Sequence, residues 1–292
     1  MKKLFLLFVF VLLTFSKSFP QWSTDPNNNL IVGYGLNPDL CSDSAGGCYL
    51  TYEYETTGYP RKLAVERIDK YGYKPWGTLK QIQGELPEQW QAELIEDGEG
   101  GVLVSYEDNE WIPPSTSTTR VRMQRVDSSG SFLWGPTGVR VTTEEINHGV
   151  QAIVSDGEGG CVVVWPNQLP NCTYEYRANR INNLGEIVWS DTGIFIENNI
   201  NSERANIVRA SDGHYYVQIR RNLYRIRENG EILRRDSVTL GYPIPDPERG
   251  VVLSGKTGTL NNIKLVAQRK DSLGNNLWQE PYVEIADSLH MN

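Results

Sequence analysis

The chain contains 292 residues with a formal net charge of −8 at pH 7, and 39% of the residues are hydrophobic. An acidic protein repels phosphate groups, which argues against nucleic acid and anionic membrane surfaces as partners and leaves calcium ions and basic partners open. Three histidines and the lack of a CxxC pair argue against a metal site, so we expect no metal and no cofactor.

Residues 1–18 have the pattern of a secretory signal peptide. Lys2 and Lys3 precede an apolar run at residues 4–15, and Ser16 and Ser18 are small residues at the positions that a signal peptidase recognises. The run is shorter than the roughly 20 apolar residues that a membrane-spanning helix needs, which disfavours the alternative of an uncleaved anchor. We therefore expect a secreted or cell-surface protein, extracellular or periplasmic in a bacterium, with no membrane insertion after signal cleavage.

The first predicted element of the mature chain is an outer strand, formed by Trp22 and residues 27–32, that lacks a sheet of its own. Five similar segments with a strand and a glycine turn follow at residues 62–77, 120–135, 176–190, 223–234 and 263–279. Residues 282–285 then supply an outer strand to the fifth segment. One outer strand is surplus, so a ring closed by either end of the chain competes with an open piece of a longer propeller.

Each of the five units is predicted to contain four short strands. In the third unit, residues 150–156 and 176–182 alternate, residues 161–165 are continuously apolar, and residues 186–196 follow a second glycine turn. The sequence DGEGG occurs at residues 97–101 and again at 156–160, because the turn after the first strand needs positive φ, which glycine adopts at little cost. Four strands in a repeat of roughly 45 to 55 residues are typical of a propeller blade.

Four tryptophans stand at one position of the unit, four residues after the turn glycine: Trp76, Trp134, Trp189 and Trp278. A tryptophan at a fixed position is expected to pack between neighbouring sheets, because it buries a large apolar area. The fourth unit has Arg234 there and has lost the double glycine of its first turn. We therefore expect the fourth unit to be the least regular.

The acidic residue, turn glycine and tryptophan of each unit resemble the blade motif of quinoprotein-type propellers. The whole unit, as in DGEGG followed by QRVDSSGSFLW at residues 124–134, resembles more closely the propeller repeats of secreted or surface proteins from Bacteroidota-like bacteria. This resemblance implies an all-β fold, a β-propeller of about five four-stranded blades in one domain at residues 19–292, or an open fragment of a larger propeller. The likeness is confined to blade-building residues, so it implies no quinone cofactor.

The four cysteines form two close pairs, and an oxidising compartment makes disulfides available to an exported protein. Pairing within each couple would pin a local hairpin, although three pairings are possible and four buried thiols are the alternative. The disulfide candidates are Cys41, Cys48, Cys161 and Cys172.

The connections between the second and third strands are predicted to carry the long insertions, at residues 107–119 in the second unit and 166–173 in the third. Loops on a regular scaffold commonly carry binding residues. The candidate ligand-binding residues are therefore Tyr106, Trp111 and Trp165, and the alternative is that these aromatic residues only cover the edge of a sheet.

No catalytic constellation is evident in the sequence, because it lacks a GxSxG elbow and its three histidines have no recognisable triad partners. Asp97, Glu99, Asp156 and Glu158 are expected to be solvated turn acids rather than calcium ligands, since a tight hairpin cannot wrap an ion. We therefore expect a monomeric protein that is not an enzyme and that binds a protein or glycan partner. The alternatives are a glycan-active hydrolase with carboxylates in the central channel and a structural segment of a larger surface protein.

Overall fold

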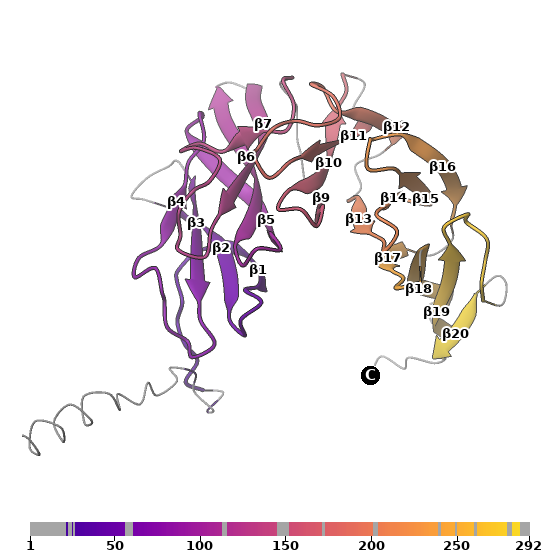
Figure 1. The fold of residues 1–292 in the computed structure, drawn as a ribbon, viewed down its shortest axis with the longest axis horizontal. Helices are drawn as coiled ribbons and strands as arrows, with labels where there is room; N and C mark the ends of the chain where they lie inside the picture. The colour runs from indigo at the N-terminus through magenta and orange to yellow at the C-terminus, as the bar shows by residue number, and fades with distance from the viewer. Residues whose placement is uncertain are drawn as a thin grey trace, which may run out of the picture.

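A computed structural model describes residues 22, 25, 27–55, 61–112, 116–144, 152–170, 173–200, 204–238, 241–248, 250–259, 262–278 and 282–286. The predicted signal peptide at residues 1–18 lies outside this range. The described residues form five four-stranded antiparallel sheets and no helix (Figure 1). The all-β prediction and the four strands in each of five units are confirmed. No helix in the described part of the chain is long and apolar enough to cross a membrane.

The strands follow one another in chain order within each sheet. Sheet 1 contains β1 (Leu36–Ser42), β2 (Cys48–Glu55), β3 (Arg61–Ile68) and β4 (Lys80–Ile82). Sheet 2 contains β5 (Glu88–Glu96), β6 (Val102–Ile112), β7 (Thr116–Val126) and β8 (Val139–Arg140). Sheet 3 contains β9 (Ala152–Ser155), β10 (Cys161–Gln168), β11 (Tyr174–Ile181) and β12 (Ile194–Ile200). Sheet 4 contains β13 (Asn206–Arg209), β14 (Tyr215–Ile219), β15 (Asn222–Ile226) and β16 (Ile232–Ser237). Sheet 5 contains β17 (Gly241–Pro245), β18 (Gly250–Thr259), β19 (Asn262–Asp271) and β20 (Val283–Ala286).

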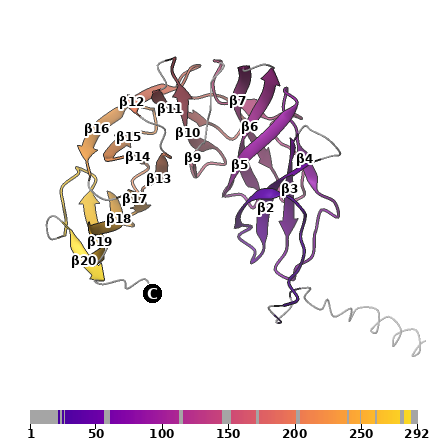
Figure 2. The same cartoon turned by 180° about the vertical axis from the view of Figure 1, so that it is seen from behind.

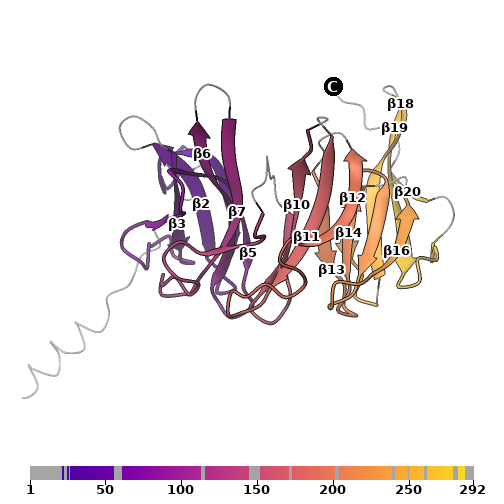
Figure 3. The ribbon, with the colours of Figure 1, turned by 90° about the horizontal axis from the view of Figure 1, so that it is seen from above.

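The five sheets form a propeller-like arc. The first strand of each sheet lies on the inside of the arc, where β1, β5, β9, β13 and β17 adjoin in succession. The arc is open between sheet 1 and sheet 5 in the front and back views (Figures 1 and 2). Seen from above, the sheets stand side by side in chain order (Figure 3).

The hydrophobic core is divided into layers between consecutive sheets. Four buried clusters join sheet 1 to 2, 2 to 3, 3 to 4 and 4 to 5. The second strand of an inner sheet is therefore covered on both faces, which explains why residues 161–165 are continuously apolar instead of alternating. Residues 107–119, expected as a long insertion, mostly extend the β6–β7 hairpin, in which Ile112 pairs with Thr116.

The first turn of sheet 2 shows why its aspartate and glycines recur. Gly98 and Gly100 have φ of 80° and 85°, which favour glycine. One oxygen of Asp97 accepts the N–H groups of Glu99 and Gly101 at 2.8 and 2.7 Å, and the other accepts Nε of Arg125 at 2.9 Å. Asp97 is 1% exposed, so the expectation of a solvated acid is wrong for this residue and for the equivalent Asp156. The Glu99 and Glu158 side chains are exposed.

Three of the repeated tryptophans bridge one sheet to the next. The indole Nε1 of Trp76 donates to the carbonyl of Ser128 at 3.0 Å, Trp134 donates to Asn183 at 3.1 Å, and Trp189 donates to Glu228 at 2.7 Å. Each acceptor lies in the turn between the third and fourth strands of the following sheet. Each interface therefore joins a donor on one sheet to a turn carbonyl on the next.

The three described cysteines, Cys41, Cys48 and Cys161, are free thiols, so the expected disulfide between Cys41 and Cys48 is not present. Cys41 pairs with Tyr49 while Cys48 pairs with Ser42, and neighbouring residues of a strand face opposite sides of the sheet. Cys41 accordingly packs against the core between sheets 1 and 2, whereas Cys48 packs on the outer face of sheet 1. The candidate Cys172 lies outside the described residues.

Residues 27–32, predicted as an outer strand, form no strand. Leu30 and Val32 instead pack on the outer face of sheet 1, against the buried cluster of Leu50, Tyr52, Ala64 and Ile68. The segment predicted as a surplus outer strand therefore covers the outer face of sheet 1 and does not join sheet 5 to close a ring.

Candidate functional site

The inner strands of the arc border two adjoining hollows that share Glu93 and Arg204. One has a volume of about 260 Å³ and is also lined by Asn37, Asp39 and Gln91. The other has a volume of about 370 Å³ and is also lined by residues 152–153, 205–208 and 242–243. All five sheets thus contribute their first strand or the residues just before it to one concave region. We call this region the central hollow.

Backbone bulges on three inner strands shape the central hollow. Asn37, Gln91 and Tyr242 have φ of 48°, 49° and 60°, which is uncommon for residues other than glycine. At each of them the strand pairing shifts by one residue, as expected for a β-bulge, which redirects the side chains that follow it. The bulges therefore decide which side chains of β1, β5 and β17 reach the hollow.

Polar side chains of the neighbouring strands hold these bulges. The buried carboxylate of Glu53 on β2 accepts the backbone N–H of Gln91 at 2.9 Å and the side-chain amide of Asn37 at 3.0 Å. The side chain of Gln218 on β14 accepts the N–H of Tyr242 at 2.9 Å. A strained backbone persists where its surroundings fix it in this way. Glu53 thus supports the bulges of sheets 1 and 2 at once.

Two carboxyl groups meet in the central hollow, Asp39 from β1 and Glu93 from β5. Oδ2 of Asp39 accepts the N–H of Leu94 at 2.7 Å, which ties the first sheet to the second. Burial raises the pKa of Glu93, the Arg204 cation that pairs with it opposes this shift, and the charge of Asp39 raises the pKa further. The two carboxyl groups are therefore close enough to influence each other and have different surroundings.

The walls of the hollow carry an exposed cation and an exposed aromatic ring. The side chain of Arg204 is 65% exposed although it contacts Glu93, and Tyr242 is 68% exposed. Ile153, Ala205 and Pro243 also line the hollow, although each of them is buried. A concave site with an apolar wall and a few polar groups is typical of small-ligand binding, and a carboxyl pair can exchange protons with a ligand.

The candidate ligand residues of the sequence lie elsewhere. Tyr106 is fully buried between sheets 1 and 2, and its hydroxyl donates to the carbonyl of Thr137 at 2.6 Å. Trp165 is fully buried between sheets 2 and 3. Neither side chain is available to a ligand, because both pack inside the core. Trp111 lies in β6, and its side chain is outside the described residues.

The sequence reasoning missed the residues of the central hollow. Asp39, Glu93, Arg204 and Tyr242 come from four different units and share no motif. The signal that could have found them is their position in or just before the first strand of a unit, since these strands surround the axis of a propeller.

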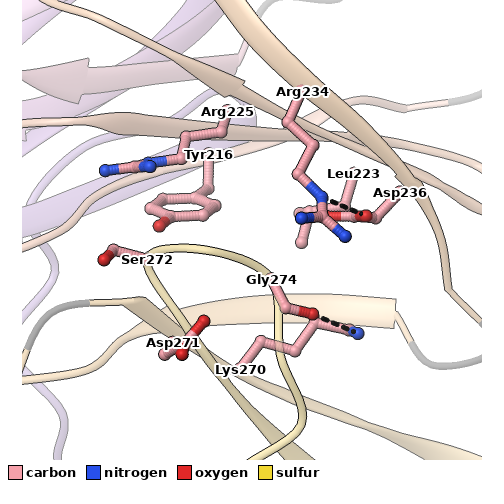
Figure 4. A pocket seen from close by; sticks show the side chains of 9 residues that line it. All are labelled: Tyr216, Leu223, Arg225, Arg234, Asp236, Lys270, Asp271, Ser272 and Gly274. Carbon is pink, nitrogen blue, oxygen red and sulfur yellow. Dashed lines mark hydrogen bonds and ion pairs between the residues drawn. The ribbon is translucent and has the colours of Figure 1, made fainter.

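A small cavity of about 10 Å³ lies between sheets 4 and 5 (Figure 4). It adjoins Arg234, which stands at the tryptophan position, donates Nε to Asp236 at 2.6 Å and reaches the carbonyl of Leu273 in the next turn. The hydroxyl of Tyr216, which lines the cavity, is buried without a hydrogen-bond partner among the described residues. Because this volume is comparable to one water molecule, the cavity is too small for a larger ligand.

Comparisons with protein-family models and with curated proteins give no match. Among solved structures, an ulvan lyase from a family of polysaccharide lyases is 10% identical, with a TM-score of 0.54 over 86% of this chain and 69% of that chain. A protein of unknown function from Dyadobacter fermentans is 11% identical, with a TM-score of 0.51 over 85% and 82%. A glycoside hydrolase from Xanthomonas citri is 10% identical, with a TM-score of 0.39 over 84% and 83%. At these identities the likeness shows the fold alone.

The fold comparison corrects one expectation. The lack of catalytic motifs led to the prediction that the chain is not an enzyme, yet solved structures with this fold include a polysaccharide lyase. A propeller can therefore assemble a catalytic site from residues scattered over several sheets, and such a site leaves no local motif in the sequence. The absence of a motif is consequently no argument against catalysis in this fold.

Proposed function

We propose that this protein is a glycan-active hydrolase whose active site is the central hollow, with Glu93 and Asp39 as its reacting carboxyl groups. The observation that carries the proposal is the meeting of these two side chains in one concave region. Most glycoside hydrolases use two carboxyl groups to hydrolyse a glycosidic bond, one as a general acid and one as a nucleophile or general base.

The surroundings of the two carboxyl groups suit different roles. Glu93 is the proton donor to the leaving oxygen, because burial raises its pKa and favours the protonated form. Asp39 is the nucleophile or general base. The N–H of Leu94 donates to its Oδ2 and so orients the carboxylate, and the reaction would use the other oxygen. Arg204 would contact a polar or anionic group of the glycan, because its guanidinium is largely exposed.

The size and lining of the central hollow agree with a saccharide. Its larger part, about 370 Å³, lies at the lower end of the volumes of small-ligand pockets. The exposed ring of Tyr242 offers an apolar surface for the C–H face of a sugar. The fold shared with a polysaccharide lyase supports a glycan as the substrate class.

The test is a screen of purified protein against plant, algal and bacterial polysaccharides. Hydrolysis releases reducing ends, whereas elimination by a lyase also gives an unsaturated product that absorbs ultraviolet light, so the two reactions are distinguishable. Glu93→Gln and Asp39→Asn should each lower kcat by about 10²- to 10⁴-fold on the best substrate. The matched control is Glu158→Gln, which changes an exposed turn acid outside the hollow. Full activity in both hollow variants, or no cleavage of any glycan, would contradict the proposal.

A further inference from the structure

The N-terminal segment reproduces the contact that joins one sheet to the next. Nε1 of Trp22 donates to the carbonyl of Lys70 at 3.1 Å. Lys70 is the second residue of the turn at residues 69–72, and the acceptors of Trp76, Trp134 and Trp189 are the second residues of the corresponding turns. Trp22 therefore binds sheet 1 as the tryptophan of a preceding sheet would.

Further contacts fit this segment closely to the outer face of sheet 1. Lys74 Nζ donates to the carbonyl of Val32 at 2.5 Å, and Leu30 and Val32 cover the cluster on that face. A Cβ atom on Gly33 would lie 2.6 Å from the ring of Tyr52, so a larger residue there would have to displace this ring. We call Trp22 together with residues 27–35 the N-terminal cap.

The far face of sheet 5 carries the matching donors. Trp278 stands four residues after its turn glycine, as Trp76 does, but is 38% exposed. Arg269 corresponds to Arg67 of sheet 1, whose Nη1 and the indole of Trp76 both donate to the carbonyl of Ser128 in sheet 2. No sheet follows β20 in the described part of the chain, so this donor pair faces no turn.

Apolar side chains accompany these donors. Ile244 pairs with Val252, and Val252 pairs with Arg269, so these residues share one face of sheet 5. Ile244 is 52% exposed and Val283 on the outer strand is 38% exposed. We call this surface of Ile244, Arg269, Trp278 and Val283 the free face.

We propose that the free face docks onto the outer face of sheet 1 of a second copy of this chain, and that the N-terminal cap blocks this contact. The outer face of sheet 1 is the natural partner, because its turn at residues 69–72 is equivalent to three turns that accept a tryptophan inside the molecule. Its acceptor carbonyl and apolar cluster are occupied by the cap of the same chain. The open arc separates the two faces within one molecule, so the partner is another copy (Figure 1).

The experiment compares the association of four proteins by sedimentation velocity between about 1 µM and 1 mM. The wild type should remain monomeric, and Trp22→Ala should associate as its concentration rises. Trp22→Ala with Trp278→Ala should weaken this association at least tenfold. Trp22→Ala with Leu184→Ala is the matched control and should associate like the single variant, because Leu184 is an exposed apolar residue on a turn of sheet 3.

A second route to the uncapped state guards against misfolding of Trp22→Ala. Leu30→Ser with Val32→Ser removes the apolar contacts of the cap and should give the same association, and an excess of a peptide of residues 19–35 should reverse it. A folded uncapped variant that stays monomeric would overturn the proposal. Association that persists after Trp278→Ala, or a wild type that already associates to the same degree, would also overturn it.

Discussion

The buried carboxylate of Glu53 is the support on which the central hollow depends, and Glu53→Gln tests it. One oxygen of Glu53 accepts two bonds from the bulges, and the other accepts Arg61 Nη1 at 3.3 Å. A glutamine keeps the shape but has one acceptor oxygen, and its amide group would face a guanidinium that also donates.

The size of the effect follows from these contacts. A hydrogen bond to a charged group contributes about 1.5–3 kcal/mol, and the Arg61 partner is partly exposed, which lowers its share. We expect Glu53→Gln to lower the free energy of unfolding by about 2–3 kcal/mol. Glu55→Gln on the same strand is the control, and its exposed side chain should change that free energy by less than about 0.5 kcal/mol.

Urea unfolding followed by tryptophan fluorescence gives both free energies, provided that the slope with denaturant is the same in each variant. A second readout is the activity on the glycan found by the screen. Glu53→Gln should lower kcat although Glu53 does not line the hollow, because the bulge that directs Glu93 relaxes. A free energy equal to that of Glu55→Gln would refute the view that Glu53 holds the bulges.

Three further predictions concern other parts of the molecule. Asp97→Asn should lower the free energy of unfolding by about 3 kcal/mol, because the buried Arg125 then keeps only the exposed Glu99 as an acidic partner. Glu99→Gln should lower the same free energy by less than about 1 kcal/mol, and urea unfolding of both variants measures the difference. Burial raises the pKa of Glu93 in the folded protein, so its protonated form adds stability at low pH that is lost as the pH rises through the folded pKa. The free energy of unfolding measured across this range should decline, and Glu93→Gln should flatten the decline; an identical pH profile in this variant would contradict the prediction. Burial raises the pKa of Cys41 to about 12 and also raises that of Cys161. In a Cys48→Ser, Cys172→Ser background, a thiol reagent should therefore label the half-buried Cys41 slowly in the native protein and the buried Cys161 only after unfolding; rapid labelling of Cys161 in the native protein would exclude its buried placement.

The fold was predictable from the sequence because its signals are local. Glycine at residues 98 and 100 marks a turn, alternation marks a strand, and the tryptophan four residues after a turn glycine marks the contact between sheets. The pairing of Cys41 with Cys48 failed because closeness in the sequence does not tell which face of the strand each side chain takes.

The central hollow was not predictable for a different reason. Asp39 and Glu93 lie 54 residues apart, and their meeting depends on bulges at Asn37 and Gln91 that are stabilised by a side chain of another strand. Asn37 adopts a left-handed backbone more readily than most residues, but an isolated asparagine does not predict a bulge, and the glutamine at position 91 gives no such signal. Tyr106 and Trp165 were attractive as ligand residues because they precede long connections, but the same large side chains fill the space between sheets.

The contact between sheets gives the arc a direction. Every sheet presents an indole donor, or an arginine in the fourth unit, on one side and a turn carbonyl on the other, so the two ends of the molecule are chemically unlike. Two like ends cannot bind each other, and a copy that adds head to tail leaves another end open until a ring closes. Such growth produces a closed ring or a filament of undefined length, in contrast to a two-fold dimer. Trp22 of the N-terminal cap occupies the turn carbonyl of sheet 1 in the same chain, so head-to-tail growth stops at the monomer.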